Sequence, residues 1–215
     1  MKLVLGIILA VMTPFCVLAQ STISEPTEGT RDAASQGLST LRSLISPSDL
    51  PLMGVRSIDE FGRSQLGAPI PIYFFSLRAI RNFEPGTDPN AVLKTRNKFL
   101  YPVKLGNLVV SSIVVQQTKK GWGATDLGDL GLVKSATKAI TDSATSNQIQ
   151  ASLYFLVEIP GLSLYFVGHR SGTGIILQSI SDVPDIDLKA AVEEPAEKIF
   201  EALKPLAQGS YDSPG

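Results

Sequence analysis

The first nineteen residues determine whether the folded chain can contain a disulfide bond. Lys2 supplies a positive start, residues 3–12 form an apolar run, and Val17-Leu18-Ala19 provides a small-residue cleavage site. This pattern is typical of a secretory signal peptide, residues 1–19. Cleavage there removes Cys16, the only cysteine of the 215-residue chain. The mature chain is then disulfide-free, so packing alone must stabilise it even in an oxidising compartment.

The same segment sets the expected destination. The apolar run from Leu3 to Ala19 is interrupted by Pro14 and is shorter than the roughly 20 residues that cross a bilayer. We therefore expect an exported protein, periplasmic or secreted, with no membrane span after signal cleavage. The alternative is a lipoprotein in which Cys16 is lipidated, although Thr13-Pro14-Phe15 is a poor match to the small residues that such a site needs.

The net charge and the small number of metal-ligating residues limit which partners and metals the chain can bind. Lys2 is one of 19 Lys and Arg residues, which stand against 20 Asp and Glu residues, so its removal leaves a slightly acidic chain. Nucleic acid requires clustered positive charge, so the expected partner is instead a small molecule or an envelope protein. Zinc sites use several imidazole or thiolate ligands, and His169 is the only histidine. We expect no cofactor and no metal.

Composition divides the chain into four parts. Residues 20–31 are polar and read as a flexible N-terminal tether after the signal peptide. Residues 32–207 hold the periodic apolar patterns and are expected to form a single α+β domain. Residues 208–215 are small and polar, which is typical of a disordered tail.

Helical spacing of apolar residues predicts three packed helices, over residues 32–45, 129–143 and 195–205. Gly37 weakens the first helix by about 1 kcal/mol relative to alanine, so that helix should depend on docking. Asp129 is placed to cap the second helix. Pro195 fits the first turn of the third helix, and Pro205 should disturb or end it.

Short turns separate the predicted strands. Gly106-Asn107 suits a tight hairpin between strands 99–105 and 108–117, and a turn at residues 119–121 leads to a third strand. Alternating apolar residues over 149–159 give the clearest strand period in the chain. Turns at Pro160-Gly161 and at residues 172–174 continue this strand into two more. The expected fold is therefore α+β, with an antiparallel sheet built from two meanders and about three helices.

Aromatic residues supply the leading candidate site. Consecutive aromatic residues in strands place rings on both faces of the sheet, so one face is either covered by helices or open as a groove. We expect an exported, non-catalytic binding or accessory protein of the cell envelope that uses such a groove. The candidate ligand-binding residues are Tyr73, Phe75, Trp122, Tyr154 and Tyr165.

A hydrolase is the first alternative. It would use either a carboxylate pair, Asp126 and Asp129, or His169 as the base for Ser171. No Gly-x-Ser-x-Gly elbow frames Ser171, and a surface turn is the favoured interpretation of this segment. Asp129 is more simply explained as a helix cap.

Strand addition is the second alternative. Pro69 and Pro71 confine the apolar stretch Ile70–Leu77 to a sheet edge or a strand start, where it would accept a strand from a partner in a structural or assembly role. Three further aspartates could suggest a calcium loop, but they lack the pattern of an EF-hand and fit capping and solvated-loop roles better. These are Asp182, Asp185 and Asp187.

Overall fold

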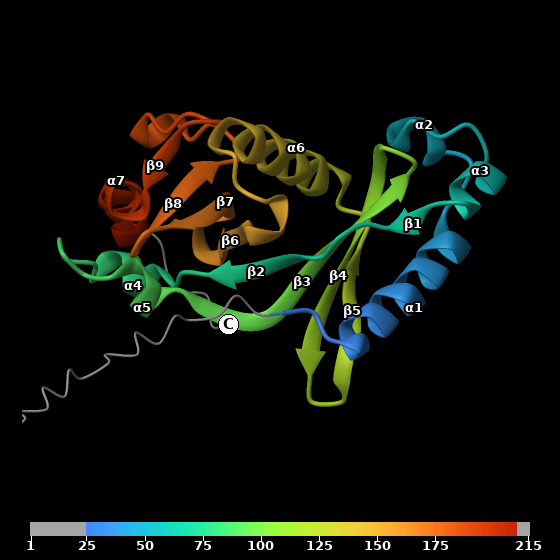
Figure 1. Cartoon of the computed structure of the whole chain (residues 1–215), viewed down its shortest axis with the longest axis horizontal. Coiled ribbons are helices and arrows are strands. Elements are labelled where there is room, and N and C mark those ends of the chain that lie inside the picture. The colour runs from blue at the N-terminus through green and yellow to red at the C-terminus, as the bar shows by residue number, and fades with distance from the viewer. Residues whose placement is uncertain (1–24, 210–215) are drawn as a thin grey trace, which may run out of the picture.

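The computed structural model describes residues 25–209 (Figure 1). The expected signal peptide, residues 1–19, lies outside the described residues, as do residues 20–24 and 210–215. The described chain has mixed α and β content, with a nine-stranded, mostly antiparallel sheet and seven α-helices. Within it, no helix combines the length and the apolar character needed to cross a membrane.

The nine strands differ widely in length, and the two longest form the hairpin in the middle of the chain. They are β1 (Gln65–Leu66), β2 (Ile70–Phe74), β3 (Lys94–Leu105), β4 (Leu108–Thr118), β5 (Gly121–Leu127), β6 (Phe155–Ile159), β7 (Leu164–Ser171), β8 (Gly174–Ser179) and β9 (Glu193–Pro195).

Three of the helices are long and four are short. They are α1 (Glu28–Leu44), α2 (Leu50–Met53), α3 (Ile58–Gly62), α4 (Leu77–Arg81), α5 (Pro89–Val92), α6 (Leu130–Asn147) and α7 (Ala196–Gly209). Three 3-10 turns lie in the second half of the chain, namely η1 (Ala151–Leu153), η2 (Pro160–Leu162) and η3 (Pro184–Ile186).

The strands form one sheet in the order β5-β4-β3-β2-β6-β7-β8-β9, with β1 paired to β3. All neighbours are antiparallel except β2 and β6, which run parallel and join the two halves of the chain. The hairpin predicted at Gly106-Asn107 is confirmed, because β3 and β4 pair on either side of it and Gly106 has a φ of 60°.

Of the two positions expected for Ile70–Leu77, the sheet edge is wrong, whereas the strand start is confirmed, since β2 begins at Ile70. Strand β2 lies inside the sheet, between β3 and β6. Pro71 is tolerated there because pairing with β6 begins only at Ile72, so Pro71 pairs with Phe99 of β3 alone. Strand addition at this stretch is therefore excluded.

One face of the sheet carries helices at both ends. Helix α1 packs on β3, β4 and β5, with Leu38 and Leu41 against Phe99 and Ile113. At the other end α7 and α4 pack together, and Phe200 of α7 contacts the ring of Phe75. Figure 1 shows α1 and α7 at opposite ends of the sheet.

Helix α6 covers the opposite face near its centre. Its residues Val133, Ala136 and Ile140 pack on side chains from several strands, including Leu100 of β3 and Leu156 of β6. Asp129 caps this helix as predicted, because its Oδ1 accepts a hydrogen bond of 2.9 Å from the amide of Leu132.

Three local predictions need correction. Helix α1 begins at Glu28 rather than Asp32, so residues 28–31 of the expected tether are helical, and Thr30 is buried. Helix α1 therefore begins just before Thr30, the first residue of its buried face. Helix α7 continues through Pro205 to Gly209, because Leu203 and Ala207 on either side are buried and packing outweighs the roughly 3 kcal/mol cost of an interior proline.

The third correction concerns residues 149–159. Only Phe155–Ile159 form a strand, whereas Ala151–Leu153 form a 3-10 turn and are exposed. Helix α6 runs on to Asn147 and ends at Gln148 in a left-handed conformation. The following residues must then carry the chain from α6 to a strand parallel with β2, so the alternating pattern does not continue as sheet.

Candidate functional site

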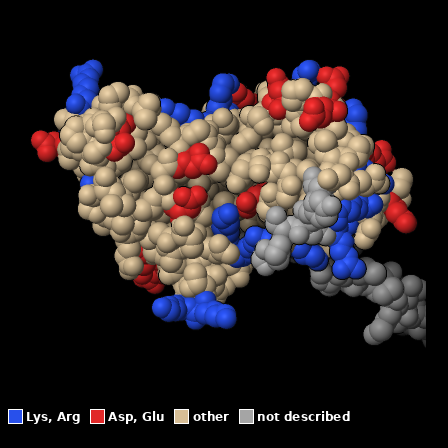
Figure 2. All heavy atoms as spheres, turned by 180° about the vertical axis from the view of Figure 1, so that it is seen from behind, with Lys and Arg blue, Asp and Glu red and all other residues tan. Residues whose placement is uncertain are grey.

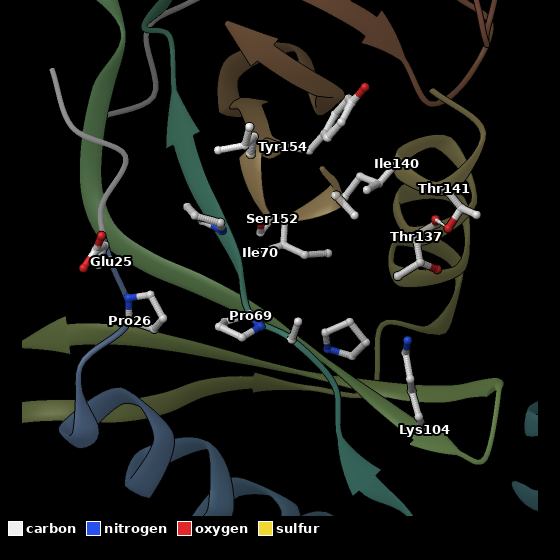
Figure 3. A pocket seen from close by; sticks show the side chains of 15 residues that line it. Glu25, Pro26, Pro69, Ile70, Lys104, Thr137, Ile140, Thr141, Ser152 and Tyr154 are labelled. Atoms are coloured by element: carbon white, nitrogen blue, oxygen red, sulfur yellow. Dashed lines mark hydrogen bonds between the residues drawn. The ribbon is translucent and has the colours of Figure 1, made fainter. Parts of the chain in front are cut away.

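An open groove of about 800 Å³ lies on the α6 face of the sheet. One wall is α6, and the other is formed by η1 and the residue after it (Figure 3). Glu25 and Lys104 lie at opposite ends of the view. We call this cavity the α6 groove.

The floor of the α6 groove is apolar. It is formed by Ile70, Pro69 and Pro71 at the start of β2, together with Pro102 of β3. Prolines offer no backbone N–H, so this floor supplies almost no hydrogen-bond donors. Leu153 adds an exposed apolar side chain at the wall.

The groove has few polar groups, and they differ in whether they are already hydrogen-bonded within the protein. Thr137 and Thr141 of α6 donate their hydroxyls to the carbonyls of Val133 and Thr137, at 2.7 and 2.8 Å. These donors are therefore already used. Lys104 points from β3 toward α6 in Figure 3, and no acceptor among the described residues lies within hydrogen-bonding distance of its Nζ. The groove thus joins an apolar surface to the ammonium group of Lys104 at one end and to the carboxylate of Glu25 at the other.

Two of the aromatic residues proposed from the sequence are core residues. Tyr73 and Phe75 are buried beneath α4 and α7, where Tyr73 packs on Phe155 with 5.2 Å between ring centroids. Phe75 packs edge-on to Phe200 at 4.4 Å. The expectation that these rings line an open groove is wrong, because helices cover this end of the sheet.

Tyr154 is buried, yet it lines the α6 groove. Its hydroxyl lies 2.8 Å from Ser143 Oγ and points away from the proline floor in Figure 3. Trp122 lies apart from it, half-buried against Phe99 in the core beneath α1. These four predicted residues therefore lie in three different packing regions.

Tyr165 is half-buried on the same side of the sheet as α6. Its hydroxyl donates to Glu158 Oε1 at 3.4 Å, and Glu158 also pairs with Lys98 at 3.1 Å. Burial raises the pKa of Tyr165 to about 12, helped by the charge and hydrogen bond of Glu158 and by the charges of Asp129 and Asp126. A phenol with so high a pKa stays neutral at physiological pH.

The alternative pair His169 and Ser171 does not form a catalytic arrangement. His169 is buried in strand β7, not on a surface turn, whereas Ser171 is exposed at the end of that strand. The histidine Nε2 faces Glu193 at 4.0 Å, and its ring packs on Tyr154 at 5.1 Å. It is therefore turned toward the protein interior rather than toward Ser171.

The carboxylates of Asp126 and Asp129 are both exposed, and Asp129 is engaged as the cap of α6. The loop aspartates hold their own segment, because Asp182 accepts from the amide of Ala190 at 2.7 Å and Asp187 pairs with Lys189 at 3.1 Å. Among residues 25–209, no cluster of three or more His, Cys, Asp or Glu could hold a metal ion.

The residues that line the α6 groove were not found from the sequence, apart from Tyr154. Lys104, Ile140 and Leu153 are distant in the chain and meet only because β2 pairs with both β3 and β6. The one available signal in the sequence was the pair Pro69 and Pro71 beside a strand start. Figure 2 shows acidic and basic side chains scattered over one, mostly uncharged face of the molecule, with several Lys and Arg side chains close together at its lower right.

Comparisons with known proteins add no assignment, since no family model, no curated protein and no solved structure matches the chain.

Proposed function

We propose that this chain is an exported, non-catalytic binding protein of the cell envelope that takes a largely apolar, anionic small molecule in the α6 groove. The single observation that supports this function is the combination, in one groove of about 800 Å³, of a proline and isoleucine floor with the available ammonium group of Lys104. Pockets of this size with an apolar lining and few polar groups are typical ligand sites.

The chemistry of the lining selects the ligand. An apolar body would cover Leu153, the exposed apolar side chain of the lining, and removing this surface from water would contribute to the affinity. A carboxylate, sulfonate or phosphate on the ligand would pair with Lys104. The threonine hydroxyls of α6 are already donated to backbone carbonyls, so a neutral polyol finds few free donors.

Two fluorescent probes test this site, namely 8-anilinonaphthalene-1-sulfonate, which is anionic, and N-phenyl-1-naphthylamine, which is neutral. We expect both to bind the wild-type protein and Leu153→Glu to weaken both. Leu108→Glu is the matched control, since Leu108 is 42% exposed and Leu153 48%, and Leu108 lies outside the groove. Equal binding by the two variants would reject the α6 groove as the site.

Lys104→Gln separates charge from apolar contact. It should weaken the anionic probe by about tenfold, as expected for a charged hydrogen bond, and leave the neutral probe nearly unchanged. Lys120→Gln, on the exposed β4–β5 turn, is the control. Export is tested by sequencing the N-terminus of the extracytoplasmic protein, which should begin at Gln20.

A further inference from the structure

The α6 groove carries opposite charges at its two ends. Figure 3 shows Glu25, which precedes helix α1, at one end and Lys104 of β3 at the other, with the apolar floor between them. All the other residues of the lining are uncharged. Among residues 25–209, no salt bridge joins these two side chains to each other or to a third residue. Both charges are therefore available to a ligand.

The Lys104 side chain is supported along its hydrocarbon stem. A Cβ on Gly67 would lie 3.2 Å from Lys104 Cε and 3.4 Å from Lys104 Cδ, so the stem passes close over a residue without a side chain. The amide of Gly67 donates to the carbonyl oxygen of Pro102 at 2.6 Å, which holds this backbone against β3. Lysine commonly packs its stem in this way while its ammonium group stays in contact with water.

The carboxylate at the other end is accessible. Glu25 is exposed, and it lines the groove together with Pro26. A ligand can therefore reach the Glu25 carboxylate without any rearrangement of the core.

The surface between the two charges favours a hydrocarbon body over a peptide. The prolines of the floor have no N–H, and the hydroxyls of Thr137 and Thr141 are already donated to backbone carbonyls. A peptide laid across this surface would exchange its hydrogen bonds to water for few in the groove, which is unfavourable. An alkyl chain loses no hydrogen bonds there.

From these observations we infer that the ligand of the α6 groove is a linear zwitterion, with an anionic group at Lys104, an ammonium group at Glu25 and a hydrocarbon body between them. This inference rests on the function proposed above and adds to it the cationic group and a defined length. A ligand whose length matches the separation of the two charges engages both of them at once, whereas a shorter one engages only one.

Displacement of N-phenyl-1-naphthylamine from the wild-type protein tests the inference. The competitors are ω-amino acids from aminohexanoate to aminohexadecanoate, with the alkanoates and alkylamines of the same chain lengths as controls that carry one charge. We expect the affinity of the amino acids to pass through a maximum at one chain length. The affinity of each control series should instead rise steadily with length, because every added methylene buries more apolar surface.

Glu25→Gln should weaken the best amino acid by about fivefold, the upper range for a pair with an exposed carboxylate, and leave the alkanoate of that length unweakened. Glu28→Gln is the matched control, because Glu28 is also exposed but lies outside the groove lining. Lys104→Gln should weaken the amino acid and the alkanoate but not the alkylamine.

The results separate this inference from the proposed function. If the neutral probe binds and Leu153→Glu weakens it, the groove is a ligand site. In that case, a steady rise of amino acid affinity with length, or equal effects of Glu25→Gln and Glu28→Gln, would overturn the zwitterionic ligand alone. If the neutral probe does not bind the wild-type protein, the proposed function and this inference fail together.

Discussion

His169 Nε2 lies 4.0 Å from a carboxylate oxygen of Glu193, so the only histidine of the chain, in strand β7, faces strand β9 without hydrogen bonding to it. The same carboxylate accepts hydrogen bonds from Ser143 Oγ and from Asn147 Nδ2 of α6, the latter at 3.0 Å. Glu193 is thus a junction of α6, β7 and β9. This polar cluster gives the histidine a structural explanation in place of a catalytic one.

Glu193→Ala should lower the free energy of unfolding by about 1–3 kcal/mol, because it leaves the Ser143 and Asn147 donors without their acceptor. Hydrogen exchange should quicken at the C-terminal end of α6. Glu194→Ala is the matched control on the same strand, since Glu194 pairs with the exposed Lys198 and such pairs contribute at most about 1 kcal/mol. A larger loss in the control would contradict the junction.

Gly37→Ala should destabilise the protein, although alanine favours helix by about 1 kcal/mol. A Cβ at this position would lie 2.8 Å from Ile113 Cγ2 and 2.9 Å from Ala124 Cβ, both in the sheet under α1. Overpacking of this kind costs about 1–3 kcal/mol. Denaturant unfolding measures the change.

Gly131→Ala is the opposite case and serves as the control. In the first turn of α6, a Cβ at this position meets only Asp129 Oδ1, at 3.7 Å. We expect it to raise the free energy of unfolding by up to about 1 kcal/mol. If both alanine variants stabilised the protein, the close approach of α1 to the sheet would be wrong.

Stability should fall in alkaline solution partly through Tyr165. Its pKa is about 12 in the folded chain against an ordinary value of 10.0, so between these values the folded state holds a proton that the unfolded state has lost. The free energy of unfolding therefore decreases as pH rises through this window, and the contribution is fully present below pH 10.0.

Tyr165→Phe removes this titration, so its free energy of unfolding should fall less steeply than that of the wild type over the same window. Glu158→Gln should give an intermediate slope, because it removes the negative charge and the carboxylate acceptor but leaves the burial. Parallel slopes in the wild type and Tyr165→Phe would contradict the raised pKa.

Asp129→Ala should lower the free energy of unfolding by about 1 kcal/mol through loss of the α6 cap. Asp129→Asn should behave like the wild type, because asparagine is an equally good cap. Asp126→Ala, at an exposed position, should change stability by no more than about 0.5 kcal/mol. A large loss in Asp129→Asn would indicate that its charge has another role.

Features that depend on neighbouring residues could be predicted from the sequence. The hairpin turn needs only Gly106-Asn107 between two apolar runs, and the α6 cap needs only Asp129 before a helical period. The mixed α+β content followed from such local signals. Gly37 was correctly recognised as requiring docking, but the partner strands could not be identified from helical spacing.

Tertiary structure alone decided where the aromatic rings, the cavities and the buried polar groups lie. Ile72 pairs with Leu156, far along the chain, and this pairing places β2 inside the sheet despite Pro71. It also creates the α6 groove and determines which rings are covered. The burial of Ser64, whose Oγ has no hydrogen-bond partner among the described residues, was likewise not predictable from the sequence. Turns and caps depend on a few adjacent residues. Burial depends on how apolar side chains from distant parts of the chain pack together on the sheet.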